Sequence, residues 1–255
     1  MSRRRLDQFL VEQGLAPSRT RARDLIEAGQ VSRLTAQGRE VLRKASLEIA
    51  EDERLEIAEG EADRFVSRGG LKLAGALGRI SLDPRGLAVL DVGQSTGGFS
   101  DCLLQAEAAL VVGVDVGRDQ LHPRLRSHPR LKFFEGINAR DLRGRDEVRG
   151  MFPQGSADLI VMDLSFISQT LVFPVLDFFA RPGTRLLSLV KPQFEVGPSG
   201  LGKGGIVKDP LLYDEVERKM KQALTGAGWK VLSYFESPLT GKDGNKEFFI
   251  HGVWQ

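Results

Sequence analysis

The pattern of apolar and polar positions divides the chain into two parts. In the first part, apolar residues recur at helical spacing over residues 5–13, and Gly14 ends this helix. A second helix is expected to begin after Ser18, a favourable N-cap residue, and to end at Gly29. Short apolar patches then predict brief strands at positions 31, 41–42, 47–49 and 55–57. These elements predict a small α+β module.

From residue 88 onward the pattern changes to alternating strands and helices. The predicted strands cover residues 88–92, 110–114, 131–134, 159–162, 185–190, 230–235 and 247–253. Helical stretches separate the first five, as a doubly wound parallel sheet requires. A glycine-rich loop at 240–245 leaves no room for a crossover helix, so the last two strands should be antiparallel. This α/β arrangement is typical of a class I (Rossmann-like) methyltransferase with a mostly parallel seven-stranded sheet.

An acidic stretch rich in small residues, at positions 59–63, marks the boundary between the two parts. We therefore predict a first domain at 1–60, a linker at 61–66 and a methyltransferase domain at 67–255.

Composition adds little to this division. The chain has 255 residues, of which 41% are hydrophobic and 27% charged, as in an ordinary globular protein. No apolar run is long enough to span a bilayer, and no signal-peptide pattern follows the first arginines, so we expect a cytoplasmic protein. The single cysteine, Cys102, excludes an intramolecular disulfide, and the three histidines have no metal-ligand spacing. We expect no bound metal and, because no dimerisation segment stands out, a monomer.

Charge is distributed unevenly along the chain. The net charge is only +2, but residues 1–44 hold ten basic and five acidic side chains. This local excess suggests a polyanionic partner, although a solvated charged surface explains it equally well. The candidate RNA-binding residues are Arg3, Arg4, Arg5, Arg19, Arg21, Arg23 and Lys44, with Arg68 and Lys203 further along the chain.

A glycine-rich loop follows the first predicted strand of the second part. Its glycines allow a tight turn and let a ligand approach the backbone. The spacing fits neither the G-x-G-x-x-G fingerprint nor a P-loop. An aspartate before the first glycine suits a ligand with a cationic amino acid part, which points to S-adenosylmethionine. A tight connection without a ligand is the alternative.

Two further positions fit a nucleoside ligand. Asp115 ends the next strand, 24 residues after Asp91, where a carboxylate can accept both ribose hydroxyls. Asn138 follows the third strand and can read adenine, although asparagine is also common in turns. The predicted cofactor-binding residues are Asp91, Gly93, Gln94, Ser95, Thr96, Gly97, Gly98, Phe99, Asp115, Asn138 and Asp163.

Four charged residues form a candidate catalytic set. Lys72 precedes the Rossmann-like part, Asp163 and Lys191 end the fourth and fifth strands, and Glu247 begins the last strand. Ligands of open α/β sheets bind at the carboxyl ends of the strands, so these side chains should converge. Each residue alone is more simply a surface charge, but the set suits methylation of a ribose 2′-hydroxyl.

The 2′-hydroxyl is a poor nucleophile until it loses its proton. A lysine can take that proton only when partly neutral, a form favoured by burial beside a second ammonium group. We predict Lys191 as the base, with Lys72, Asp163 and Glu247 positioning it and the substrate oxygen. Alignment for in-line displacement would supply much of the rate.

The first part resembles the S4 RNA-binding domain. The resemblance rests on Arg5-Leu6-Asp7-Gln8-Phe9-Leu10, on Ser18-Arg19-Thr20-Arg21-Ala22-Arg23, on Leu25-Ile26-Glu27-Ala28-Gly29 and on Val31. It implies that Arg19, Arg21 and Arg23 face RNA; helical spacing puts Arg19 and Arg23 on one face and Arg21 elsewhere. The turn within residues 31–38 departs from the family pattern, which puts the hairpin geometry in doubt.

Nearly the whole chain resembles the TlyA, or hemolysin A, family. The motifs that carry the resemblance are Ser67-Arg68-Gly69-Gly70-Leu71-Lys72, Asp91-Val92-Gly93 with Ser95-Thr96-Gly97-Gly98-Phe99, Asp163-Leu164-Ser165-Phe166-Ile167-Ser168, Leu189-Val190-Lys191-Pro192-Gln193-Phe194-Glu195 and Gly244-Asn245-Lys246-Glu247-Phe248. The resemblance implies an FtsJ-like catalytic domain that 2′-O-methylates cytidine in ribosomal RNA, of the large subunit (23S) and possibly also the small subunit (16S). Its Lys-Asp-Lys-Glu tetrad maps onto Lys72, Asp163, Lys191 and Glu247. Gln94 departs from the alanine that the family more often has, which can alter cofactor affinity.

The loop at 197–205, which contains Lys203, is either a lid over the substrate nucleotide or a plain surface loop. Two other functions compete with the enzyme. A membrane-active hemolysin would need a transmembrane run or a long basic amphipathic helix, and neither is evident. A non-catalytic ribosome-binding protein would not need the complete tetrad.

Overall fold

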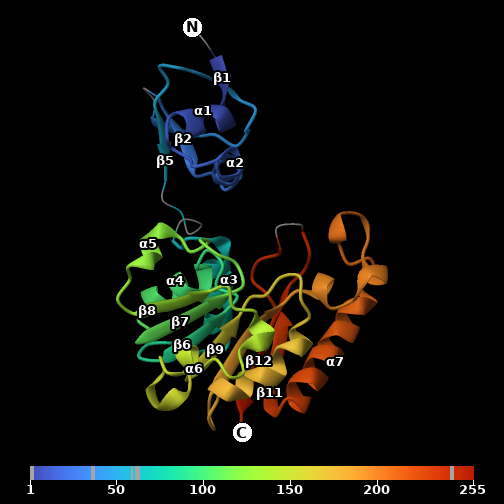
Figure 1. Ribbon diagram of the computed structural model, residues 1–255. Helices are drawn as coiled ribbons and strands as arrows, with labels where there is room; N and C mark the ends of the chain where they lie inside the picture. Colours follow the sequence, from blue (N-terminus) through green and yellow to red (C-terminus); the bar gives the residue numbers. More distant parts are fainter. Residues whose placement is uncertain (1–2, 36–37, 59, 61–63, 242–243) are drawn as a thin grey trace. The chain divides into compact units, whose positions relative to one another are not determined.

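The computed structural model describes residues 3–35, 38–58, 60, 64–241 and 244–255 (Figure 1). The chain forms two compact units, Met1–Arg64 and Phe65–Gln255. Positions 61–63 of the proposed linker lie outside the described residues. Phe65 and Val66, which we assigned to the linker, instead pack into the core of the second unit.

Within its described residues, the first unit contains two short helices and five short strands. The elements are β1 (Arg3–Arg5), α1 (Leu6–Glu12), α2 (Arg19–Glu27), β2 (Val31–Thr35), β3 (Gly38–Val41), β4 (Glu48–Ala50) and β5 (Leu55–Ile57). The helices begin and end close to the predicted positions: Ser18 caps α2 by accepting a hydrogen bond from the Arg21 amide, and Gly29 follows it with φ +71°. Leu6, Leu10 and Ile26 are fully buried in a core shared by the helices and strands.

The sequence pattern missed strand β1. Its three arginines are exposed, so no apolar alternation marks the strand, and it forms by antiparallel backbone pairing with β4. Strand β2 pairs with both β3 and β5. The unusual turn within 31–38 lies in the β2–β3 hairpin, and its positions 36–37 are outside the described residues.

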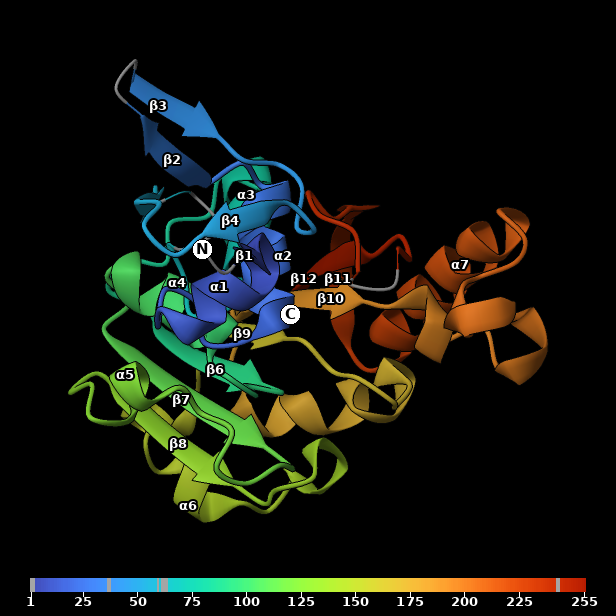
Figure 2. The ribbon, with the colours of Figure 1, turned by 90° about the horizontal axis from the view of Figure 1, so that it is seen from above.

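The second unit is built on a seven-stranded sheet with the order β11-β12-β10-β9-β6-β7-β8 (Figure 2). Its strands are β6 (Ala88–Val92), β7 (Leu110–Asp115), β8 (Leu131–Glu135), β9 (Leu159–Met162), β10 (Arg185–Val190), β11 (Trp229–Glu236) and β12 (Phe248–Trp254). The first five run parallel, and β12 pairs antiparallel with both β10 and β11. The predicted class I methyltransferase fold is therefore confirmed.

The crossover helices are less regular than predicted. Only α3 (Arg68–Arg79), α4 (Gly98–Gln105) and α7 (Leu211–Gly226) are longer than one or two turns in the described part of this unit. The single-turn helices are α5 (Pro123–Arg126) and α6 (Asp146–Arg149), and the segment from β9 to β10 has 3-10 turns at Gln169–Leu171 and Phe173–Phe179. Prolines and glycines interrupt these segments, and neither residue type supports a long helix.

Both faces of the sheet are buried, which explains why its central parallel strands are mostly apolar on both faces. Along β6, Leu90 and Val92 join one apolar cluster and Val89 joins the other. Cys102 on α4 is buried in the second cluster. The loops at the carboxyl ends of the parallel strands are thus held by a rigid, well-packed sheet.

Candidate active site

Two adjoining cavities lie at the carboxyl ends of the parallel strands. The first has a volume of about 370 Å³ and the second about 780 Å³. Both are lined by Gly93, Ser95, Asp163, Ser165 and Phe166. Because the cavities share these walls, one elongated ligand can extend from the first into the second.

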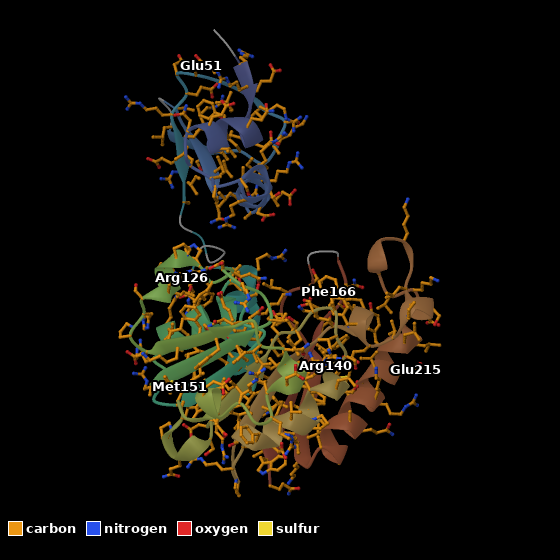
Figure 3. The ribbon with its side chains drawn as sticks, viewed as in Figure 1. Glu51, Arg126, Arg140, Met151, Phe166 and Glu215 are labelled. Carbon is orange, nitrogen blue, oxygen red and sulfur yellow. The ribbon has the colours of Figure 1, made fainter. Side chains whose placement is uncertain are left out.

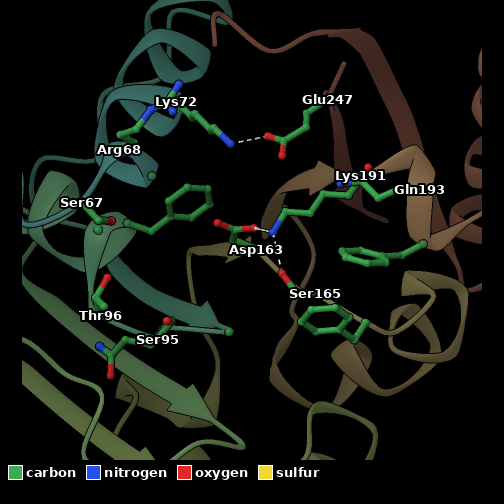
Figure 4. A pocket seen from close by; sticks show the side chains of 17 residues that line it. Ser67, Arg68, Lys72, Ser95, Thr96, Asp163, Ser165, Lys191, Gln193 and Glu247 are labelled. Carbon is green, nitrogen blue, oxygen red and sulfur yellow. Dashed lines mark hydrogen bonds and ion pairs between the residues drawn. The ribbon is translucent and has the colours of Figure 1, made fainter. Parts of the chain in front are cut away.

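All four predicted catalytic residues line the first cavity (Figure 4). Lys72 forms a hydrogen-bonded ion pair with Glu247, and their side chains are only 11% and 3% exposed. The Lys191 Nζ lies 2.6 Å from Asp163 Oδ1 and donates a hydrogen bond to Ser165 Oγ at 2.9 Å. Each ammonium group therefore has its own carboxylate, and the two pairs face one space.

The fold explains why residues so distant in sequence meet here. Lys72 lies on the face of α3 that also buries Leu73 and Ala76. Asp163 follows β9, and its amide donates to the carbonyl of Val92 at the end of β6. Strand β10 ends immediately before Lys191, and β12 starts immediately after Glu247. Because β12 is antiparallel to β10, its beginning lies at the carboxyl end of the parallel strands.

The glycine-rich loop is shaped for close approach. Gly93 has φ +85°, and a Cβ there would lie 2.5 Å from the carbonyl oxygen of Asp163. Gly97 has φ +92° and is the N-cap residue of α4. A Cβ on Gly98 would overlap the Ser67 hydroxyl. The glycines therefore let the loop pack closely against the Asp163 backbone and the Ser67 side chain, where any Cβ would clash.

Gln94, Ser95, Thr96, Gly98 and Phe99 line the first cavity, as a cofactor-binding loop would. Gly97 lines neither cavity, because its role is to turn the backbone into α4.

Asp91 is placed differently from our expectation of direct cofactor contact. It is fully buried and lines neither cavity, so it supports the loop from behind. Its Oδ2 accepts a hydrogen bond from the Ser100 hydroxyl at 2.6 Å, and Gln94 Nε2 donates to the same hydroxyl at 2.6 Å. Burial raises the pKa of Asp91 to about 7. Gly113 leaves the room that the Gln94 side chain occupies.

The second cavity has the features expected for a nucleoside. Asp115 accepts hydrogen bonds from the amides of Ser95 at 2.8 Å and Gly117 at 2.6 Å, and each carboxylate oxygen can accept a further bond. Asn138 lines the same cavity, but its Oδ1 caps a short turn by accepting from the Arg140 amide. Apolar walls come from Val114, Ile137, Leu164, Ile167 and Leu171. Asp115, the glycine loop and the apolar wall are groups that could hold the nucleoside part of S-adenosylmethionine.

Some lining residues were not predicted. Ser165 contacts Lys191 directly, and Gln193 and Phe194 line the first cavity. Phe166, labelled in Figure 3, is 90% exposed and has φ +64°. Its ring centroid lies 5.1 Å from that of Phe194. These residues lie within the family motifs quoted above, but the motifs alone did not mark them as lining residues. An aromatic residue is usually expected in the core, so the apolar pattern gave no sign that Phe166 is exposed.

In the first unit, three RNA-binding candidates gather around one carboxylate. Asp7 is fully buried, and it accepts hydrogen bonds from Arg5 at 3.0 Å, Arg19 at 3.0 Å and Arg23 at 3.2 Å. The guanidinium groups remain about half exposed. The hydrogen bond from Arg5, which outweighs the opposing effect of burial, holds the pKa of Asp7 well below its usual range.

The other candidates are spread over both units. Arg4 pairs with Glu12 and Glu51, and Arg3 and Lys44 are exposed. The backbone amide of Arg21 donates a hydrogen bond to the Ser18 hydroxyl at 3.2 Å. Arg68, at the start of α3, lines the first cavity, whereas Lys203 lines neither cavity.

The loop that carries Lys203 is tied down at its end. The buried Asn245 accepts a hydrogen bond from the Val207 amide at 3.1 Å and donates one to the Gly205 carbonyl at 3.0 Å. These bonds join the loop to the segment that delivers Glu247.

Among the described residues, no helix combines the length and apolar character needed to cross a bilayer. Within the same ranges, no three His, Cys, Asp or Glu side chains are grouped as a metal site would require.

Comparisons with known proteins identify the family. The model of the FtsJ-like methyltransferases matches residues 65–253, and that of the S4 domain matches residues 4–32. The 16S/23S rRNA (cytidine-2′-O)-methyltransferase TlyA of Mycobacterium tuberculosis is 40% identical over 254 residues, covering 98% of this chain and 90% of that protein. Hemolysin A of Brachyspira hyodysenteriae is 34% identical over 249 residues, covering 98% and 99%.

A solved structure, that of a candidate hemolysin from Streptococcus thermophilus, superposes with a TM-score of 0.74 and 34% identity, covering 100% of this chain and 90% of that one. The chain therefore belongs to the TlyA/hemolysin A branch of the FtsJ-like methyltransferases, carries an S4 domain, and is an S-adenosylmethionine-dependent methyltransferase.

Proposed function

We propose that this enzyme methylates the 2′-hydroxyl of a cytidine in ribosomal RNA, with Lys191 as the base. The observation that carries the proposal is the pairing of two lysines with two carboxylates around one cavity beside the cofactor loop. The name of the Mycobacterium tuberculosis relative, which covers nearly the whole chain, supports cytidine in 16S and 23S rRNA as the acceptor.

Lys191 is suited to receive the proton of the 2′-hydroxyl. Its Nζ lies at the end of a rigid strand, with Asp163 and Ser165 fixing its direction. When bound, S-adenosylmethionine would supply the electrophilic methyl group that the 2′-oxygen accepts, and S-adenosylhomocysteine would be left as the product. Lys191 would have to release its own proton first; the neutral amine would then accept the hydroxyl proton, and Asp163 would stabilise the ammonium ion that forms again.

Lys72 and Glu247 serve the acceptor oxygen. The buried Lys72 ammonium is held by Glu247, so its remaining N–H donors can be aimed at the 2′-oxygen as negative charge develops there. A fixed donor of this kind costs no reorganisation during the reaction.

The exposed aromatic pair at the cavity rim suits a nucleobase. Phe166 and Phe194 come from the loops that carry Asp163 and Lys191, and Phe166 presents its ring to solvent. A nucleotide whose ribose reaches Lys191 must leave its base stack, and an aromatic ring compensates for the lost stacking by about 1–3 kcal/mol.

The first unit supplies affinity for RNA rather than chemistry. Arg5, Arg19 and Arg23 each keep N–H donors beyond those that Asp7 occupies, and guanidinium groups bind phosphate in this way. We also propose Arg68 as an RNA contact, because it lines the catalytic cavity from the start of α3. We further propose a monomer that acts in the cytoplasm, where ribosomal subunits are its substrate.

The test is transfer of tritium from labelled S-adenosylmethionine to purified ribosomal subunits and to naked rRNA. Wild type should label RNA, and Lys191→Ala should lose at least about 100-fold in rate, the lower range of general-base contributions. Absence of label from every RNA would refute the proposed substrate. Equal labelling by Lys191→Ala would refute only the assignment of the base.

A further inference from the structure

A buried carboxylate lies behind the catalytic cavity and lines neither of the two cavities of the active site. The Glu195 side chain is 1% exposed. It accepts hydrogen bonds from the Ser168 hydroxyl at 2.6 Å, from the Gln169 amide at 2.8 Å and from Lys219 Nζ at 2.9 Å. A buried carboxylate with this many donors is a fixed point of the structure, because each lost bond leaves charge without compensation.

These bonds join the two loops that carry Asp163 and Lys191. Ser168 lies five residues after Asp163, and Glu195 four residues after Lys191. The same loops touch at the cavity surface through the Lys191–Asp163 ion pair and through the rings of Phe166 and Phe194. Glu195 therefore connects them at a deeper level, where solvent cannot compete.

The hydrogen bonds that Glu195 accepts from Ser168, Gln169 and Lys219 are called the clamp below. They are continued by bonds to strand β10 and helix α7. Gln169 Nε2 donates to the Leu189 carbonyl at 2.6 Å, and its Oε1 accepts from the Ser188 hydroxyl at 2.7 Å, both on β10. Lys219 of α7 donates also to the Glu195 carbonyl at 2.8 Å. The loop after β9 is thus bound to the strand that delivers Lys191.

We propose that Glu195 is a positioning residue, which holds the loops after β9 and β10 at the separation that lets Lys191 and Asp163 meet. Only the activity measurement that tests this proposal rests on the function proposed above. Transfer of a methyl group requires alignment, and a displacement of about 1 Å can cost about 100-fold in rate. Cofactor binding should depend less on these bonds than methyl transfer does. The glycine loop and Asp115 lie on β6, α4 and β7, whereas the loop after β9 contributes wall residues such as Leu164 and Ile167 to the second cavity.

The first test is Glu195→Gln, which keeps the shape but sets an NH₂ group against groups that donate. The single-turnover rate of methyl transfer to ribosomal RNA should fall by about 10- to 100-fold. The dissociation constant for S-adenosylmethionine, measured by calorimetry, should rise by a clearly smaller factor than the rate falls. Glu217→Gln is the matched control, since it makes the same change in the partly exposed Glu217–Lys221 pair on α7 and should change neither quantity.

A second variant protects the test against misfolding. Ser168→Ala removes the hydroxyl that donates to Glu195, and it should slow transfer by about three- to tenfold. Because Ser168 also lines the second cavity, its cofactor affinity is measured in parallel and should change by a smaller factor than the rate. Hydrogen exchange of the RNA-free proteins supplies a readout other than activity. Exchange should quicken over residues 163–171 and 191–196 in both variants and stay unchanged over 88–98.

The proposal is overturned if exchange and rate match wild type in both variants. It is also overturned if Glu195→Gln weakens cofactor binding as much as it slows transfer, because the defect would then be general. If wild type itself methylates no ribosomal RNA, the proposed function fails, whereas the exchange measurement still decides whether Glu195 clamps the loops.

Discussion

Replacing only one partner of the Lys72–Glu247 ion pair should lower the free energy of unfolding. Replacing both partners should lower it much less. The pair lies in the catalytic cavity, with side chains 11% and 3% exposed. We consider Lys72→Met, Glu247→Leu and the double variant. Each single change leaves one nearly buried charge without its partner, whereas the double change leaves an apolar contact of similar volume.

Breaking a buried ion pair from one side costs about 3–5 kcal/mol, whereas replacing both charges with apolar groups is often neutral or stabilising. Both side chains border a cavity that solvent can enter, so we expect the lower end, about 3 kcal/mol for each single variant. For a unit of this size, that loss lowers the Tm by roughly 6–12 °C. The double variant should recover at least about 2 kcal/mol of the summed losses.

Urea unfolding followed by tryptophan fluorescence measures this directly. Both tryptophans of the chain, Trp229 and Trp254, are in the methyltransferase unit, and their rings lie 5.2 Å apart. The signal therefore reports this unit alone. The slope of free energy against urea should stay constant across the variants, so that the midpoints give the stability differences. Methyl transfer should be lost in all three variants.

Losses that simply add in the double variant would show that the two charges do not stabilise each other, and the paired arrangement would be wrong. Single variants as stable as wild type would show that solvent screens the pair. A stable double variant without activity would show that the charges are present for catalysis.

Three further predictions concern the cofactor site and the first unit. Asp115→Ala should weaken S-adenosylmethionine binding at least about tenfold in calorimetry, through loss of about 1.4 kcal/mol of hydrogen bonding to the ribose; unchanged affinity would remove this residue from the cofactor site. Gly93→Ala should lower the free energy of unfolding by more than about 1 kcal/mol in urea titrations and abolish cofactor binding. Gly93 has φ +85°, and a Cβ there would lie 2.5 Å from the Asp163 carbonyl oxygen. A fully stable variant would contradict the loop geometry. The pKa of Asp7 is lowered in the folded protein, so the carboxylate stabilises the fold above the pKa of the unfolded state, about 3.9, and this contribution is lost as the pH falls below that value. Asp7→Asn should therefore remove part of the acid unfolding transition seen by circular dichroism. The same acid transition in the variant would refute this.

The main features of the sheet could be predicted because burial on both faces leaves a direct trace in the sequence. The strands around Val89 and Leu187 are mostly apolar, and both residues are fully buried. The four catalytic candidates could be predicted to converge because the carboxyl ends of parallel strands share one edge, and the antiparallel last strand starts there.

Other features leave no such trace. Strand β1 pairs through its backbone and exposes all its side chains, so Arg3–Arg5 reads as a basic tail. An aspartate before a glycine loop has the same sequence pattern whether it touches the ligand or, like Asp91, supports the loop from behind. The exposure of Phe166 depends on a positive φ that a non-glycine residue rarely adopts. The burial of Glu195 depends on three donors from separate elements, which no local pattern encodes.

The central claim is the chemistry at the 2′-hydroxyl, and nucleoside mass spectrometry tests it most directly. Ribosomal subunits treated with the enzyme and S-adenosylmethionine would be digested to nucleosides and compared with untreated subunits. The geometry around Lys191 predicts a gain of 2′-O-methylcytidine that disappears with Lys191→Ala. A methyl group on a base, or no methylated nucleoside with active wild-type protein, would contradict the account.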